Sequence, residues 1–180
     1  MGSGELIVEH EGVYRSAAWP VDVKSRCAAF CAADDRVVVC CGGAAQLCEY
    51  RSCTKVGVHI TTTAPGRPIG GSTVVHRCSI MPTGHADHRP DGIRVTSPVR
   101  TVFDLAKHVE PITLESVIEQ GLRRRQFDIT ALYDVGKLLC RRGRDGASQF
   151  DPPRPRRSGV RVLHRGGRSR VAWRSTGLDG

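Results

Sequence analysis

The sequence feature that most constrains the fold is a helix start at Ser97 and Pro98. Serine is a favoured N-cap residue, and proline suits the first helical position, where its missing N–H group has no partner to lose. Apolar residues then follow at helical spacing: Val99, Val102, Phe103, Ala106 and Val109. Such a helix must bury its apolar face against other elements, so the sequence predicts a packed core.

Two further helices are predicted after this one. Pro111 ends the first helix, and residues 113–125 continue with an apolar face formed by Leu114, Val117, Ile118 and Leu122. A third helix is predicted to start at Phe127 and Asp128 and to run to Arg142, although Gly136 weakens it. Three consecutive helices therefore close the predicted domain.

The region before Ser97 predicts strands and two shorter helices. We expect a strand over residues 5–15 around a turn at Glu11 and Gly12, and a helix over 21–33. A strand over 37–40 leads through a turn at Gly42 and Gly43 into a short helix over 44–47. Strands over 56–63 and 72–81 are expected to pair across the loop between them, and a short strand over 93–95 follows a polar loop at 82–91. The predicted fold class is α+β, a small mixed or antiparallel sheet packed with about five helices.

The composition changes abruptly near Phe150. Residues 151–180 carry eight arginines against Asp151 and Asp179, which is +6 of the total charge of +9. We therefore predict one domain over 1–150 and a disordered, Arg/Pro/Gly-rich tail over 151–180. The tail is typical either of an electrostatic contact with nucleic acid or of a solvated terminus.

The sequence predicts a cytoplasmic protein. No stretch reaches the roughly 18 consecutive apolar residues that span a bilayer, and the first residues do not resemble a signal peptide. The eight cysteines are then expected to be reduced thiols. No contact with a membrane is expected.

Zinc is the first chemistry to consider, because the chain has eight cysteines and seven histidines. One hypothesis is a zinc module held by Cys27, Cys31, Cys48 and Cys53, to which the segments 76–78 and 85–88 could add ligands. No CxxC pair occurs, and buried thiols that act as small apolar residues are the favoured interpretation. We therefore predict no metal and no cofactor. Because neither a phosphate-binding loop nor a cluster of carboxylates is found, we also predict no catalytic residue and no small-molecule substrate.

Arginines are the candidate binding residues. Arg94 and Arg100 flank the helix start at Ser97, where anions bind readily, and Arg123, Arg124 and Arg125 end the following helix. The alternative is that cations at a helix C-terminus simply complement the helix dipole.

Several segments match a known family. Residues 91–106, DGIRVTSPVRTVFDLA, resemble the "GIPVTSPARTLLDLA" segment of actinobacterial AbiEi-type antitoxins, also called type IV toxin–antitoxin antitoxins. Residues 11–15 and 74–77 are similar to the family's "GVYR" and "VRVHRS" strands, and 58–67 to its "TVPRGRR" segment. Residues 114–125 are similar to its "ALERALDEALRRG" helix and 141–146 to its "GRRGRPG" turn, so the resemblance covers about residues 11–147.

The resemblance implies a non-catalytic regulator whose partners are a nucleotidyltransferase-like toxin and DNA. It also implies that the chain starts at the last strand of a winged helix, with residues 5–15 as its remnant. The very-short-patch-repair-like nuclease domain of many relatives is not recognisable. The alternatives are the inactive front part of an antitoxin–nuclease fusion, whose tail is read out of frame, and the zinc module.

Overall fold

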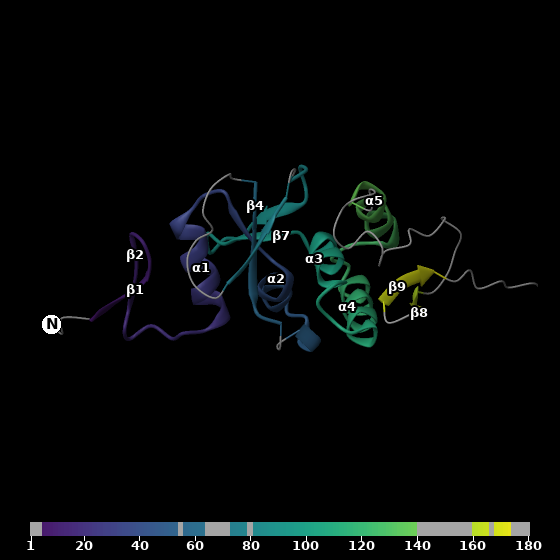
Figure 1. The fold of residues 1–180 in the computed structure, drawn as a ribbon, viewed down its shortest axis with the longest axis horizontal. Coiled ribbons are helices and arrows are strands. Elements are labelled where there is room, and N and C mark those ends of the chain that lie inside the picture. The colour runs from purple at the N-terminus through teal and green to yellow at the C-terminus, as the bar shows by residue number, and fades with distance from the viewer. Residues whose placement is uncertain are drawn as a thin grey trace, which may run out of the picture. The chain divides into compact units, whose positions relative to one another are not determined.

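The computed structural model describes residues 5–53, 56–63, 73–78, 81–139, 160–165 and 168–173, which form two compact units (Figure 1). The first unit comprises the described residues up to Glu49 and from 56 to Ser97, and the second comprises Tyr50–Cys53 and the described residues from Pro98 onward. The sequence predicted a single domain over 1–150 and a separate tail over 151–180, and this division stays a prediction. The two units meet along the chain between Ser97 and Pro98, at the predicted helix start.

A five-stranded mixed sheet organises the first unit, in the order β5-β4-β3-β7-β6. The strands are β3 (Val37–Cys40), β4 (Val58–Thr62), β5 (Val74–Arg77), β6 (Ala86–His88) and β7 (Arg94–Thr96). The central strand β3 is antiparallel to β4 and parallel to β7, while β6 runs antiparallel to β7. The mixed sheet and the five α-helices of the described chain confirm the predicted α+β class.

Two helices pack on this sheet. Asp22 and Ser25 form a capping box that starts α1 (Val23–Ala33), and α2 (Cys41–Leu47) follows β3 directly. The core between them consists of buried residues from α1, β3, α2 and β7: Cys27, Cys31, Val39, Ala44, Ile93 and Val95. Phe30 packs beside it against Val37 and Ile60, so α1 covers the sheet face that carries these side chains.

A hairpin precedes α1. It pairs β1 (Leu6–His10) with β2 (Val13–Ser16), and Gly12 at the turn has a φ of 75°, which glycine adopts without strain. The expected turn at Glu11 and Gly12 is confirmed. The ring of His10 lies 4.6 Å from that of Phe30, so the hairpin contacts α1.

The second unit holds the three consecutive helices. They are α3 (Pro98–Leu105), α4 (Pro111–Arg123) and α5 (Ile129–Leu139), and α3 contacts both others (Figure 1). The short 3-10 helix η1 (Arg51–Cys53) packs on α4. Most members of the predicted faces are buried, including Val102, Phe103, Leu114, Val117, Ile118 and Leu132. Val99 and Leu122 are only half-buried, and the buried Leu105 and Val135 were not among the predicted residues.

The structure differs from the sequence predictions near the two prolines that start helices, Pro98 and Pro111. The Ser97 hydroxyl, predicted to cap α3, is buried and accepts no hydrogen bond. Helix α3 ends at Leu105, not Val109, because Glu110 must be extended before a proline, and Pro111 starts α4 at its first position.

Three further differences lie in the strands. The predicted turn at Gly42 and Gly43 is helical. The predicted polar loop at 82–91 contains β6, a three-residue edge strand too short and too polar to show alternation. Strands β4 and β5 pair as expected, but they run in parallel, whereas the strands of a hairpin are antiparallel.

The region predicted as a disordered tail contains an antiparallel pair, β8 (Val160–Arg165) with β9 (Arg168–Trp173). Gly166 and Gly167 lie between these segments in the sequence, and two glycines between β-branched residues are typical of a hairpin. The arginine-rich composition concealed this pattern. Residues 140–159, which include the predicted boundary and the end of the predicted third helix, lie outside the described residues.

We predict that Gly42→Ala strongly destabilises the protein. The added Cβ would lie 2.3 Å from the Val56 carbonyl oxygen and 2.4 Å from that of Gly57, and neither backbone atom can move away freely. The expected loss in the free energy of unfolding is about 3 kcal/mol, at the upper end for overpacking. Gly57→Ala is the control, because its Cβ meets nothing within 4 Å, and it should stay within about 0.5 kcal/mol of wild type. Urea denaturation followed by circular dichroism measures both, and equal midpoints would contradict the packing argument.

Candidate metal centre

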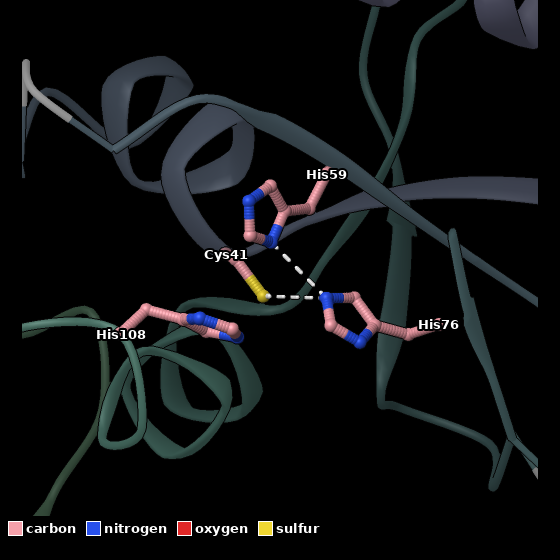
Figure 2. A group of neighbouring side chains, drawn as sticks. All are labelled: Cys41, His59, His76 and His108. Atoms are coloured by element: carbon pink, nitrogen blue, oxygen red, sulfur yellow. Dashed lines mark hydrogen bonds between the residues drawn. The ribbon is translucent and has the colours of Figure 1, made fainter. Parts of the chain in front are cut away.

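Three potential metal ligands converge in the first unit: Cys41, His59 and His76 (Figure 2). The His59 Nδ1 atom lies 3.0 Å from His76 Nε2, and the Cys41 Sγ atom lies 3.9 Å from the same Nε2. All three ligand atoms lie within 4.8 Å of one another. His108, also drawn in Figure 2, belongs to the second unit.

The strand register explains why the two histidines meet. His59 on β4 lies opposite Cys40 on β3, and His76 on β5 lies opposite Thr61. Because side chains alternate along a strand, residues 59 and 61 share one face, and His76 therefore shares it as well. This face is the one opposite α1, and the two imidazoles are diagonal neighbours on it.

Cys41 reaches the site from the junction between β3 and α2. Its φ of 49° is left-handed, a conformation that costs a residue other than glycine about 1–3 kcal/mol and persists only where the surroundings hold it. Cys41 forms an isolated antiparallel bridge with Val58, and Gly42 packs against the carbonyls of Val56 and Gly57. These backbone contacts fix the thiol, which is almost completely buried.

The residue types suit zinc. Thiolate sulfur and imidazole nitrogen are its usual ligands, and two half-buried imidazoles with one buried thiol provide three of the four donors of a tetrahedral ion. The buried Cys40 thiol, 3.6 Å from Cys41 Sγ, is also close. Hard ions such as magnesium and calcium prefer oxygen ligands and would not suit this group.

The thiols that the sequence hypothesis assigned to zinc do not come together. Cys27 and Cys31 lie in the core, Cys48 follows α2, and Cys53 belongs to the second unit. Among the described residues, the group of potential ligands contains none of these four cysteines. Burial raises the pKa of Cys27 to about 12 and the pKa of Cys48 to about 11. Cys27 packs in the core, and the Cys31 thiol accepts a hydrogen bond from the Arg94 backbone N–H.

His76, one of the residues that could add a ligand, does lie in the group, whereas His85 and His88 do not. Sequence reasoning missed Cys41 and His59. The two histidines are 17 positions apart in the sequence, which is no recognisable ligand spacing. The sequence shows only that Cys41, His59 and His76 lie in or next to predicted strands. This observation points to a common site only when the pairing of β3, β4 and β5 is known.

The candidate binding arginines divide into two groups. The Arg94 guanidinium donates to the backbone carbonyls of Val37, Cys31 and Asp34, and Arg100 is buried with its Nε atom 2.9 Å from an Asp104 carboxylate oxygen. Both side chains therefore serve their own unit. The other three, Arg123, Arg124 and Arg125, are exposed at the C-terminal end of α4.

Comparisons with family models, with curated proteins and with solved structures find no match to this chain. The family resemblance is therefore carried by the sequence segments alone, and function has to be argued from the residues. Among the described residues, no helix combines the length and the apolar character needed to cross a bilayer.

We predict that Arg94 is structural. Arg94→Ala removes three charge-assisted hydrogen bonds to backbone carbonyls and should lower the free energy of unfolding by about 2–4 kcal/mol. Arg94→Lys should recover only part of this loss, because one ammonium cannot reproduce the spread of a guanidinium. The matched control Arg123→Ala removes an exposed arginine and should change stability by less than about 0.5 kcal/mol. Chemical denaturation measures all three, and a stable Arg94→Ala variant would return Arg94 to the binding candidates.

Proposed function

We propose that the chain is a non-catalytic, antitoxin-like regulator of the cytoplasm, which binds a nucleotidyltransferase-like toxin and contacts DNA. The proposal rests on the resemblance of residues 91–106 to AbiEi-type antitoxins and on the surfaces that the two units expose. The observation that carries it is the exposed run of three arginines, Arg123–Arg125, at the end of α4.

The segment that carries the resemblance is itself mostly interior. It forms β7 and α3, in which Val95, Thr101, Val102 and Leu105 are buried, and its two arginines are engaged within their units. Its residue pattern is therefore explained by packing. Contacts with a partner must come from other surfaces.

The arginine run is suited to an anionic partner. Three successive guanidinium groups provide several donors each in a fixed planar geometry that matches phosphate oxygens. They are exposed, whereas Arg94 and Arg100 are occupied. Helix α4 ends at Arg123, Arg124 is its C-cap, and Arg125 has a positive φ of 54°, so the run follows the chain as it leaves the helix.

We expect Arg123→Ala/Arg124→Ala/Arg125→Ala to weaken DNA binding. Each lost phosphate contact should lower the slope of log affinity against log salt by about one, and the weakening should be similar for different sequences. Fluorescence anisotropy with a duplex from the gene's upstream region and with a scrambled duplex, over a salt series, measures this.

The matched control for the arginine run is Arg26→Ala/Arg36→Ala/Arg51→Ala, which removes the same charge from other exposed positions. If the control weakens binding as much, net charge and not the Arg123–Arg125 site governs the interaction. If neither variant changes the salt dependence, the DNA part of the proposal is wrong.

A second surface supports a protein partner. One face of the β1–β2 hairpin carries Leu6, Val8 and Tyr14, and Val8 lies directly opposite Tyr14. The exposed fractions of these three side chains are 63%, 66% and 61%. Trp19, just after the hairpin, is 61% exposed as well. A groove of about 390 Å³ runs between Tyr14, Trp19 and the alanines of α1. Exposed apolar residues gathered in this way mark sites of protein association.

We expect Val8→Ser/Tyr14→Ser to abolish neutralisation of the toxin while leaving the fold intact. Co-expression with the nucleotidyltransferase-like protein of the same operon, with growth as the readout, tests this. Ile112→Ser is the control, because Ile112 is 73% exposed but lies on α4. Growth rescue by Val8→Ser/Tyr14→Ser equal to that by wild type would show that the hairpin is not the toxin-binding surface.

A further inference from the structure

We propose that Cys41, His59 and His76 form a zinc-binding site that ties the start of α2 to strands β4 and β5. The inference goes beyond the regulator function and does not depend on it, because it concerns the stability and composition of the first unit. It rests on the arrangement of the three side chains (Figure 2).

The ligand atoms already lie close to the separations of a zinc site. In a tetrahedral site with Zn–N distances of about 2.0–2.1 Å and a Zn–S distance of about 2.3 Å, two nitrogens lie about 3.3 Å apart, and a nitrogen and a sulfur about 3.6 Å apart. The corresponding distances are 3.0 Å between His59 and His76 and 3.9 Å between Cys41 and His76. Small rotations of the side chains would complete the geometry, since every pair of ligand atoms lies within 4.8 Å.

The arrangement also has a chemical reason to accept a cation. His59 Nδ1 and His76 Nε2 face each other at hydrogen-bonding distance, so at most one of these two nitrogens carries a proton in that contact. The thiol of Cys41 lies next to the same nitrogen. A divalent ion among the three atoms would bind both ring nitrogens and the Cys41 thiolate; the proton between the rings moves to the other nitrogen of its imidazole, and the thiol proton is released to water. The left-handed backbone that aims Cys41 at this point is consistent with such a role.

Zinc is the ion that this donor set favours. A thiolate with two imidazoles provides soft and borderline ligands, which zinc binds in a tetrahedral arrangement. Three protein ligands leave one coordination position for water or a further donor. The ion would cross-link strands β4 and β5, which pair in parallel.

The test is metal binding by the full chain. After treatment with a chelator and dialysis, the protein is titrated with Zn²⁺ and, as a spectroscopic substitute, Co²⁺. We expect about one ion per chain by elemental analysis, a sulfur-to-cobalt charge-transfer band, and a Tm that rises with saturating Zn²⁺.

Single variants identify the ligands. Cys41→Ser should abolish the charge-transfer band, and His59→Gln and His76→Gln should each weaken Zn²⁺ binding at least 100-fold, since loss even of a group that only orients a ligand costs about 10–100-fold. Cys48→Ser and His88→Ala, a cysteine and a histidine of the same unit outside the group, are the matched controls and should bind as wild type does.

Two results would overturn the proposal. One is a wild-type chain that shows no sulfur-to-cobalt band at saturating Co²⁺, a measurement that needs no variant to fold. The other is a full complement of tightly bound zinc in Cys41→Ser/His59→Gln/His76→Gln. Neither result bears on binding of DNA or toxin, so failure of the zinc site and failure of the regulator function are distinguishable.

Discussion

A Cβ atom at position 42 would lie 2.3 Å from the carbonyl oxygen of Val56, so the chain can pass from β3 into α2 only if that position is glycine. This close backbone approach brings α2 against β4. It places Gly43 against Val39 and Val58, where a larger residue would disturb the core, and it holds Cys41 in its left-handed conformation beside the two histidines. The packing of the first unit and the geometry of its candidate metal site therefore depend on the same contact.

Whether an arginine of this protein can contact a partner depends on its burial and on its internal bonds. Five arginines looked equally suited to phosphate from the sequence. The half-buried Arg94 donates to three backbone carbonyls, and the buried Arg100 pairs with Asp104, so both guanidinium groups bond within their own units. Only the run at Arg123–Arg125 is exposed among these five. Among these five candidates, the arginines at an exposed surface are therefore those at the end of α4.

Thiol chemistry shows the same dependence on environment. Burial raises the pKa of Cys27, with a further contribution from neighbouring Cys31, and it raises the pKa of Cys48 and Cys53 as well. These thiols contribute to packing. Cys41 is buried as well, but the imidazoles of His59 and His76 lie close to its thiol. These neighbours are what make Cys41 a potential metal ligand.

The sequence by itself determined the α+β class, the helices α1, α4 and α5 to within a few residues, and the apolar faces of the three consecutive helices, because these depend on spacing along the chain. It also predicted most of the strands. The tertiary structure decided the rest: the end of α3, the parallel pairing of β4 with β5, the strand β6, and the internal bonds of Arg94 and Arg100. The group of Cys41, His59 and His76 belongs with these, because its members are brought together by strand register and by one backbone contact. Strand register and this backbone contact leave no local pattern in the sequence, because both depend on residues far apart in the chain.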